Sequence, residues 1–218
     1  MEIKAAVFDV DGLLLDTEGL QWRGWVEVLK QYGIGLSKEQ YFDYAGKSSS
    51  VIESQLIERY KLDVRKGLLV EQKKDLIAKW FSTKLRLMPH AKEAVEFFIK
   101  NKIKVATASG SIRKENVLKL KSGGLLHLFP TIISLDDVKR GKPYPDMYVF
   151  AAKRLGLKPE ECLVFEDTEF GATAAKTAGM ICIAIPSEYS VKQDFSMADA
   201  VCKNLKEAVE YAKKTYDI

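Results

Sequence analysis

An apolar run that ends in two closely spaced carboxylates constrains this chain more than any other stretch. Residues Ala5 to Phe8 have the length and apolarity of a strand buried on both faces, and Asp9 and Asp11 follow before Gly12 breaks the pattern. In an open α/β sheet, ligands bind at this carboxyl end of a strand. Two acids so close together repel each other unless a cation or a shared proton relieves the cost. We therefore expect a cation site, with an acidic turn that only caps the strand as the alternative.

The composition is that of an ordinary globular protein. The chain has 218 residues, of which 47% are hydrophobic and 29% charged, so a sizeable core is expected and disorder is not. The formal net charge is +4, but basic and acidic residues are interleaved instead of forming blocks. Mild basicity of this kind suits small anionic molecules and gives no reason to expect a nucleic-acid partner.

The expected location follows from segments that the sequence lacks. It contains no run approaching the roughly 18 apolar residues of a membrane span and no basic and apolar leader, so we expect a cytoplasmic protein with no membrane partner. Cys162, Cys182 and Cys202 form no C-x-x-C pair. That pattern favours reduced, buried side chains over a metal or redox site.

Hydrophobic periodicity divides the chain into two parts. Between residues 16 and 83 apolar residues recur at helical spacing, as at Leu20, Val26 and Leu29, and no strand is expected. From residue 84 onward helical and strand patterns alternate, which predicts βαβ units and a parallel sheet. The strands are expected at 104–107, 131–134, 162–166 and 181–185, and the helices at 91–100, 112–121, 145–155, 170–178 and 204–216. We expect an α/β core of residues 1–15 and 84–218, with a helical domain of residues 16–83 inserted after the first strand.

Three further polar motifs fall at the ends of predicted strands. They are T-A-S-G-S at 107–111, G-K-P-Y-P-D at 141–146 and E-D-T at 166–168. The first offers hydroxyl and backbone N–H groups to phosphoryl oxygens. In the second, two prolines fix the chain direction and allow Lys142 to point inward, and the third suggests another cation site. Each also fits a simple turn or a solvated side chain, but all of them fall at one edge of the same sheet.

The motifs together resemble those of the haloacid dehalogenase superfamily of phosphohydrolases. D-V-D-G-L-L-L-D-T-E, the strand end at Thr107, G-K-P-Y-P-D and E-D-T occur in the family's order, with a helical insert after the first. The likeness is to the branch that includes β-phosphoglucomutase and phosphatases of sugar phosphates or nucleotides, and it extends over residues 3–215. It implies a doubly wound, Rossmann-like parallel sheet with an α-helical cap, and an enzyme that uses Mg²⁺.

The resemblance also implies a role for each motif residue. Asp9 would be the nucleophile, Asp11 the general acid and base, Thr107 a phosphoryl ligand and Lys142 the residue that organises charge. The remaining implied residues are Ala108 and Ser109 as substrate contacts, and Asp9, the Asp11 carbonyl oxygen, Glu166 and Asp167 as Mg²⁺ ligands.

The chemistry of these residue types is consistent with that assignment. A phosphate monoester dianion resists attack by a carboxylate, so Lys142 and Mg²⁺ would have to neutralise charge. Asp9 would form an aspartyl phosphate, while Asp11 would protonate the leaving alcohol and then deprotonate the attacking water. The acid step needs a raised pKa at Asp11, which we expect from dehydration under a closed cap.

Two cap positions bear on whether the reaction is hydrolysis or a mutase reaction. Gln21 stands where β-phosphoglucomutases carry a histidine that restrains the acid and base, and Ser49 stands where they carry an arginine that binds a distal phosphate. Without these groups water is less well excluded and the second phosphate loses its clamp, so hydrolysis is favoured over the phosphomutase alternative. We expect Gln21, Lys47 and Ser49 to bind substrate, with Lys73 or Lys74 as further candidates.

Two other classes of protein share parts of this pattern. A phosphorelay receiver also combines strand-end acids, a threonine and a lysine, but the helical insert and the length argue against it. A binding protein that has lost catalysis would have lost a catalytic group, whereas all four motifs are intact. We therefore expect a monomeric phosphatase that acts on a small phosphorylated metabolite.

Overall fold

The core of the protein is a parallel β-sheet. The computed structural model describes residues 2 to 218, apart from the side chain of Lys84. Within this part of the chain, six strands pair in the order β3-β2-β1-β4-β5-β6, each parallel to its neighbours. They are β1 Ala5–Phe8, β2 Lys104–Ser109, β3 Thr131–Ser134, β4 Cys162–Glu166, β5 Ile181–Ala184 and β6 Ala200–Val201. The apolar β1 lies between β2 and β4 and is buried along its whole length.

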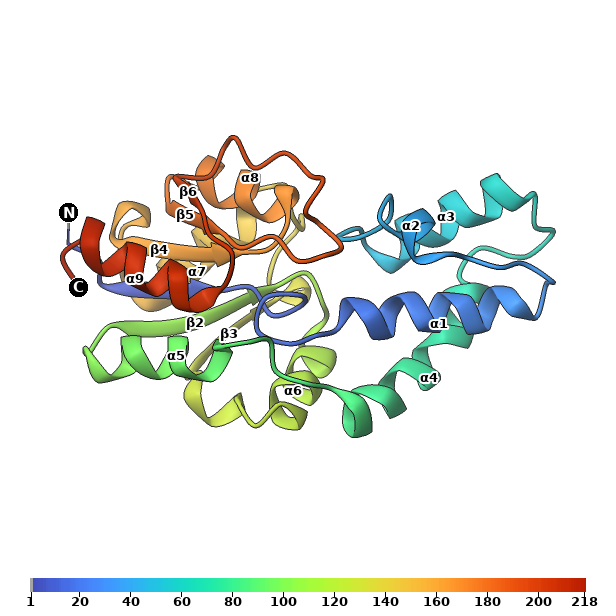
Figure 1. Cartoon of the computed structure of the whole chain (residues 1–218), viewed down its shortest axis with the longest axis horizontal. Helices are drawn as coiled ribbons and strands as arrows, with labels where there is room; N and C mark the ends of the chain where they lie inside the picture. Colours follow the sequence, from blue (N-terminus) through green and yellow to red (C-terminus); the bar gives the residue numbers. More distant parts are fainter. Residues whose placement is uncertain (1) are drawn as a thin grey trace.

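Helices cover both faces of the sheet. They are α5 Ala91–Lys100, α6 Arg113–Ser122, α7 Asp146–Leu155, α8 Glu169–Thr177 and α9 Leu205–Thr215. Successive side chains of a strand point to opposite faces, so Ala6 and Phe8 pack on one side and Ala5 and Val7 on the other. α5 and α9 cover the first side, and α7 and α8 cover the second (Figure 1). This is the doubly wound architecture that the alternating pattern predicts.

A helical cap lies at one end of the sheet (Figure 1). Its helices are α1 Glu18–Lys30, α2 Lys38–Tyr41, α3 Ser49–Tyr60 and α4 Leu68–Lys84, and all of them fall between β1 and β2 in the sequence. They enclose an apolar cluster of their own that includes Trp25, Leu29 and Leu56. Trp25 is fully buried in this cluster, as the apolar stripe of its helix predicts.

Two chain segments join the cap to the core, and they run side by side. The N–H of Asp16 donates to the carbonyl oxygen of Arg86 at 2.9 Å, and the N–H of Met88 donates to that of Leu14 at 2.9 Å. These paired segments fix where the cap begins relative to β1.

A small apolar cluster connects the cap to α6. Leu20, Ile77 and Phe81 come from the cap helices α1 and α4, and Leu118 of α6 packs against them. The base of the cap therefore rests on the helix that follows β2.

Every strand expected from the sequence is present, and the structure adds short elements that were not expected. β6 has two residues and α2 has four, which is too short for a periodic pattern. Three 3₁₀ helices also appear, η1 Leu126–Leu128, η2 Leu135–Asp137 and η3 Pro159–Glu161. β2 continues to Ser109, so the expected strand end at residue 107 is wrong by two residues, and Ala108 and Ser109 belong to the sheet.

The three cysteines are part of the packed interior. Cys162 and Cys182 belong to the cluster under α7 and α8, and Cys202 belongs to the one on the opposite face. All three are free and buried, which agrees with the expected reduced side chains.

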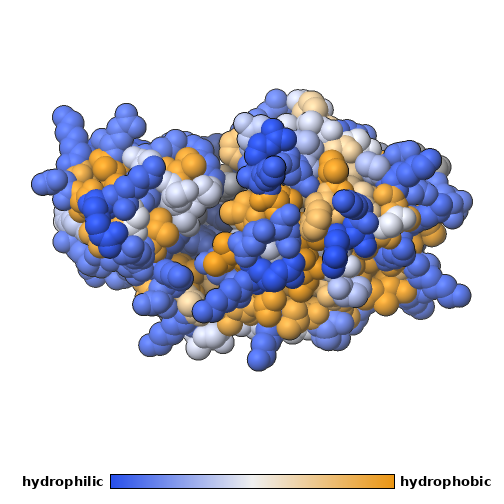
Figure 2. Space-filling model, turned by 180° about the vertical axis from the view of Figure 1, so that it is seen from behind, coloured by the Kyte–Doolittle hydropathy of each residue, from blue (hydrophilic) through white to orange (hydrophobic). Residues whose placement is uncertain are grey.

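Polar and apolar residues are unevenly distributed on the face seen in Figure 2. In the view from behind, hydrophilic residues cover most of the cap, and apolar residues gather over the lower part of the core (Figure 2). Within residues 2–218, no helix has the length and apolarity needed to cross a membrane.

The close approach of α8 to β4 can be tested at Gly171. A β-carbon there would lie 1.9 Å from the carboxyl carbon of Glu166. Alanine normally stabilises a helix interior by up to about 1 kcal/mol relative to glycine. We predict instead that Gly171→Ala lowers the free energy of unfolding by about 1–3 kcal/mol because it overpacks the site. Urea unfolding measures the change.

Gly35→Ala is the control for this prediction. A β-carbon at Gly35 has no neighbouring atom within 4 Å, so the substitution should leave stability almost unchanged. Equal stability of Gly171→Ala and Gly35→Ala would contradict the close packing of α8 on Glu166.

Candidate active site

The register of the sheet brings the sequence motifs together. Phe8 of β1 pairs with Thr107 of β2 on one side and with Phe165 of β4 on the other. Asp9 follows Phe8, and its N–H donates to the Phe165 carbonyl oxygen at 3.0 Å. Asp9 therefore lies between two neighbouring strands, one carrying Thr107 and the other ending at Glu166.

Lys142 is the cation at the centre of this cluster. Its Nζ donates to Asp9 Oδ1 at 2.5 Å, to the carbonyl oxygen of Ala108 at 3.0 Å, and to Glu166 Oε1. The side chains of Lys142, Asp9 and Glu166 are 10%, 8% and 0% exposed. Burial alone would lower the pKa of Lys142, but the two carboxylates outweigh it and raise the pKa. The candidate nucleophile thus contacts a buried ammonium that stays charged.

Acidic groups outnumber this cation. Asp9, Glu166 and Asp167 are all buried. Burial raises the pKa of Asp9 to about 7, although Lys142 acts in the opposite direction. Burial also raises the pKa of Asp167, and repulsion from Asp9 and Glu166 adds to it. A cluster with this surplus of negative charge favours a bound cation.

Several hydrogen-bond donors hold the carboxylate of Glu166. Tyr148 of α7 donates from its hydroxyl to Glu166 Oε1 at 2.5 Å, and the N–H of Asp167 donates to Oε2 at 3.1 Å. Lys142 also contacts Oε1. Because Oε1 already accepts from two donors, the Glu166 carboxylate has little freedom to turn.

Asp167 fits a metal ligand in two respects. Its Oδ1 is buried and has no hydrogen-bond partner within residues 2–218. Its Oδ2 occupies the space that a side chain at Gly12 would need, because a β-carbon on Gly12 would lie 2.1 Å from it. The carboxylate therefore faces the backbone next to Asp11, whose carbonyl oxygen is another expected ligand.

The side chains around Asp167 are compatible with Mg²⁺. The described part of the chain contains no ready-made group of three or more metal-ligating side chains. Mg²⁺ does not require one, since it keeps several waters and takes one or two carboxylates together with substrate phosphate.

Asp11 is held by a different set of groups. Its Oδ1 accepts from Lys119 Nζ at 2.6 Å, and its Oδ2 accepts from the hydroxyls of Ser109 and Ser111 at 3.0 and 3.1 Å. Burial alone would raise the pKa of Asp11, but Lys119 and hydrogen bonds such as that from Ser109 outweigh it and lower the pKa. The expectation of a raised pKa at Asp11 is therefore wrong for this structure, because it did not include the contact with Lys119.

Thr107 presents a hydroxyl without a partner. Its Oγ1 is buried and makes no hydrogen bond to any described residue. A buried hydroxyl left unpaired costs free energy, so a substrate oxygen at this position would be stabilised. Ala108 and Ser109 lie beside it, with contacts to Lys142 and Asp11 respectively. Binding of substrate by these residues at the end of β2 stays a prediction.

Gln21 and Ser49 meet at a buried lysine of the cap. Lys73 of α4 donates from Nζ to Gln21 Oε1 at 2.8 Å and to Ser49 Oγ at 3.1 Å, and the ammonium lies 4.1 Å from the centre of the Trp25 ring. Lys73 is 4% exposed, and burial lowers its pKa to about 7. Lys74, the other candidate, is exposed. Substrate contact by Gln21 and Ser49 stays a prediction.

Glu18 interacts with charged groups on both sides, Lys73 in the cap and Asp11 in the core. It is the first residue of α1 and accepts from the Tyr41 hydroxyl at 3.0 Å. Burial raises the pKa of Glu18 to about 7; the charge of Asp11 adds to the rise, and that of Lys73 opposes it. Glu18 therefore interacts with charged groups of both the cap and the core.

Lys47 has different partners from Gln21 and Ser49. Its Nζ donates to Gln55 Oε1 at 3.3 Å and lies 5.9 Å from the centre of the Tyr44 ring. Both neighbours line, with Lys47, a separate hollow of the cap. Among the described residues no hydrogen bond joins Lys47 to Gln21, Ser49 or Lys73, and its contact with substrate stays a prediction.

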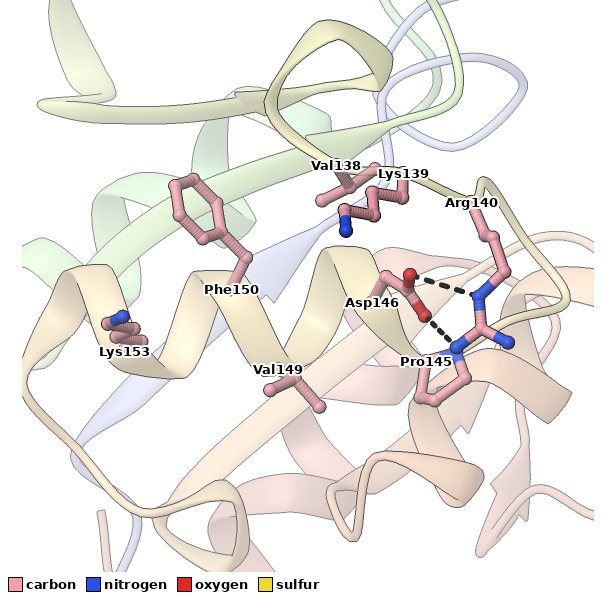
Figure 3. Close-up of a pocket in the computed structure, with 8 residues that line it drawn as sticks. All are labelled: Val138, Lys139, Arg140, Pro145, Asp146, Val149, Phe150 and Lys153. Carbon is pink, nitrogen blue, oxygen red and sulfur yellow. Dashed lines mark hydrogen bonds and ion pairs between the residues drawn. The ribbon is translucent and has the colours of Figure 1, made fainter.

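A hollow of about 440 Å³ lies beside the loop that carries Lys142 (Figure 3). Arg140 closes one end of it by donating from Nε and Nη2 to the two carboxylate oxygens of Asp146 at 3.1 and 2.9 Å. This bidentate pair joins the two ends of the loop, which restricts the position of Lys142. The residues that line the hollow are Val138, Lys139, Arg140, Pro145, Asp146, Val149, Phe150 and Lys153.

Sequence reasoning missed several side chains of the site, among them Lys119, Tyr148 and Ser190. Lys119 shares a buried helical face with Asn116 and Leu120, and that spacing of i, i+3 and i+4 is the signal that could have identified it. Ser190 donates from its hydroxyl to the Asp167 carbonyl oxygen at 2.5 Å. It lies outside any helix or strand, so no periodic pattern marks it.

The structure combines a doubly wound sheet, a helical cap and a group of carboxylates around a lysine at the strand ends. This combination is typical of one class of hydrolases. The family model for haloacid dehalogenase-like hydrolases matches residues 6–185. The chain belongs to this family.

The chain is also similar to proteins named as phosphatases over most of its length. It is 32% identical over 174 residues to fructose-1-phosphate phosphatase YqaB of Escherichia coli (strain K12), covering 80% of this chain and 92% of that protein. It is 32% identical over 182 residues to the phosphorylated carbohydrates phosphatase of Thermotoga maritima, covering 82% of each.

A solved structure of the same family also resembles the chain. A hydrolase of the family from Deinococcus radiodurans R1, crystallised with bound phosphate and sodium, superimposes with a TM-score of 0.80 and 26% identity, covering 99% of both chains. The protein is therefore a phosphatase of the haloacid dehalogenase-like family.

Lys142→Met tests the central cation. The substitution leaves the buried carboxylates of Asp9 and Glu166 without their ammonium partner, so we predict a fall in kcat of about 10²–10³-fold. The free energy of unfolding should fall by roughly 3 kcal/mol, because a buried pair has lost one member. Lys139→Met, at an exposed lysine of the same loop, is the control and should behave as wild type. Full activity in Lys142→Met would contradict this assignment.

Lys73 predicts a pH dependence of stability. Its pKa is about 7 in the folded protein against an ordinary 10.5, so between these values the unfolded chain binds more protons. The free energy of unfolding therefore rises with pH across this window. Relative to Lys73→Met, wild type should gain about 1–3 kcal/mol between roughly pH 7 and pH 9.5, measured by urea unfolding.

Lys74→Met serves as the matched control for that titration. Lys74 is exposed, so its variant should keep the pH dependence of wild type. Parallel stability curves for wild type and Lys73→Met would show that Lys73 does not titrate in this window.

Proposed function

We propose that this phosphatase hydrolyses sugar phosphates with Mg²⁺ as cofactor and Asp9 as nucleophile. The observation that carries the proposal is the 2.5 Å contact between Lys142 Nζ and Asp9 Oδ1, beside the unpaired hydroxyl of Thr107. A carboxylate paired with a buried ammonium can approach a phosphate dianion that it would otherwise repel. The same edge of the sheet then offers a hydroxyl to the phosphoryl group.

In the first step, Asp9 attacks phosphorus in line with the sugar oxygen and becomes an aspartyl phosphate. The bond between phosphorus and the sugar oxygen breaks, and Asp11 gives its proton to that oxygen. The Thr107 hydroxyl binds the phosphoryl oxygens, and Lys142 offsets the charge that Asp9 and the phosphoryl group share. Because the contacts of Asp11 favour its carboxylate form, the bound substrate has to favour the protonated form for this step.

In the second step, water attacks the phosphorus of the aspartyl phosphate. Asp11 takes the proton from this water as a carboxylate, which is the form that its contacts with Lys119 and Ser109 favour. Inorganic phosphate leaves and Asp9 is restored. Each role of Asp11 contributes typically about 10²–10⁴-fold to the rate of such a reaction.

The Mg²⁺ would be held by Asp9, Asp167 and the carbonyl oxygen of Asp11, with Glu166 adding negative charge beside them. Asp167 is the stronger side-chain candidate, because its Oδ1 is unpaired while Glu166 Oε1 already accepts from Lys142 and Tyr148. When bound, the ion supplies positive charge to the oxygens of the transferring phosphoryl group.

The sugar part of the substrate would contact the cap. Gln21, Ser49 and Lys73 provide an amide, a hydroxyl and an ammonium, which can all pair with sugar hydroxyls. Trp25 is fully buried beside them and offers no open ring face on which a nucleobase could stack. The names of the two relatives, a fructose-1-phosphate phosphatase and a phosphorylated carbohydrates phosphatase, support the same substrate class.

Phosphate release from a panel of sugar phosphates and nucleoside monophosphates tests the proposal. We predict Mg²⁺-dependent release, with sugar phosphates preferred, and a loss of at least about 10³-fold in Asp9→Asn. Asp63→Asn, at an exposed aspartate of the cap, is the matched control and should retain activity.

A different outcome of the same panel would favour the phosphomutase alternative. No phosphate release, together with conversion of β-glucose 1-phosphate to glucose 6-phosphate when a bisphosphate primer is added, would contradict hydrolysis as the reaction. Ser49 argues against that outcome, because its hydroxyl contacts Lys73 and cannot form a bidentate clamp on a second phosphate.

A further inference from the structure

Lys119 is a fully buried cation next to the acid and base residue. It lies on α6 with its side chain 0% exposed, and its Nζ donates to Asp11 Oδ1 at 2.6 Å and to Ser111 Oγ at 2.7 Å. Ser111 in turn donates to Asp11 Oδ2 at 3.1 Å. Lys119, Ser111 and Asp11 thus form a closed triangle of hydrogen bonds.

A residue of the cap completes the surroundings of Lys119. The centre of the Phe81 ring, on α4, lies 5.0 Å from the Lys119 ammonium. Phe81 is buried in the small apolar cluster that joins the cap to α6. The ring limits the access of water to the ammonium, and an ion pair that is shielded from water is stronger than an exposed one.

Stability alone does not explain a lysine at this position. Replacing a buried ion pair by well-packed apolar side chains is often neutral or stabilising for a fold. Leu120 beside Lys119 is buried, and Leu118 packs in the apolar cluster at the base of the cap, so an apolar residue at 119 would have suitable neighbours. What an apolar residue could not do is hold the carboxylate of Asp11.

No other described lysine or arginine contacts the Asp11 carboxylate. Lys142 instead pairs with Asp9 and Glu166. Without Lys119, the negative charge of Asp11 would be added to the charges of Asp9 and Glu166. The Asp11 side chain, already 21% exposed, would also be free to turn toward solvent. Catalysis by a general acid or base depends on holding that group within reach of the reacting oxygen.

We propose that Lys119 is a positioning residue for Asp11. It fixes the carboxylate against the loop between β2 and α6, beside the strand end where the phosphoryl group binds in the proposed reaction. This inference rests on the proposed function, because it assumes that Asp11 is the acid and base.

A comparison of substrates with different leaving groups can distinguish a positioning role of Lys119 from a purely structural one. A sugar alkoxide needs a proton from Asp11 as its bond to phosphorus breaks, whereas p-nitrophenolate leaves without one. The ratio kcat/KM reports the reaction only up to transfer of the phosphoryl group to Asp9, so it does not include the later step with water. Misplacement of Asp11 should therefore lower kcat/KM for a sugar phosphate and spare that for p-nitrophenyl phosphate.

The experiment measures kcat/KM of Lys119→Met with both esters. We expect a loss of about 10²-fold for the sugar phosphate that wild type hydrolyses best, and of less than about fivefold for p-nitrophenyl phosphate. Lys121→Met, at an exposed lysine of the same helix, should change neither value. Ser111→Ala removes another side of the triangle and should shift the ratio in the same direction by a smaller factor. It also supplies the test if Lys119→Met does not fold.

A double-mutant cycle provides the second readout. In an Asp11→Asn background, Lys119→Met should cause no further loss with the sugar phosphate, because a positioning residue acts only through the residue it positions. Equal losses with both esters, or additive losses in the cycle, would overturn the inference. Absence of phosphate release by wild type from either ester would instead refute the proposed function, so the two failures are distinguishable.

Discussion

The arrangement of the site depends on the contact between Lys142 and the carboxylates of Asp9 and Glu166. A parallel sheet places the ends of β1 and β4 side by side, and each of these ends carries buried acids. Such a cluster is costly unless a cation or a shared proton offsets its charge, because like charges in a dry site raise one another's pKa. Lys142 reaches the cluster from the loop before α7, and the ion pair of Arg140 with Asp146 restrains that loop. The fold thus supplies the acids, and the loop before α7 supplies the lysine that offsets part of their charge.

Asp9 and Asp11, the proposed nucleophile and the proposed acid and base, contact different lysines, and this explains why their pKa values move in opposite directions. Asp9 shares Lys142 with Glu166, and burial raises its pKa to about 7. Asp11 forms an ion pair with Lys119, and the pKa of Asp11 is lowered in spite of burial. Lys73 forms a third, separate centre in the cap. A two-step reaction benefits from such a division, since each carboxylate keeps its own environment while the other changes charge.

The sequence was informative wherever a pattern repeats or a motif ends a strand. The apolar run of β1 and the alternation after residue 84 predicted the sheet, and the strand-end motifs predicted which side chains would meet at Asp9. Periodicity could not reveal β6 or α2, because two or four residues contain no full period. Lys119 was missed although its spacing from Asn116 and Leu120 fits a buried helical face, because a lysine among several on α6 has the appearance of a solvated side chain. Its burial results from the cap resting on α6, which is a tertiary contact between distant segments.

The stereochemistry at phosphorus tests most directly whether Asp9 is the nucleophile of a two-step reaction. Attack by Asp9 followed by attack of water is a pair of in-line displacements, each of which inverts the phosphorus centre. Hydrolysis of a sugar phosphorothioate made chiral with oxygen isotopes, in isotopically labelled water, should therefore proceed with net retention. Net inversion would mean a single direct attack by water, and would contradict the role of Asp9 as nucleophile that its contact with Lys142 supports.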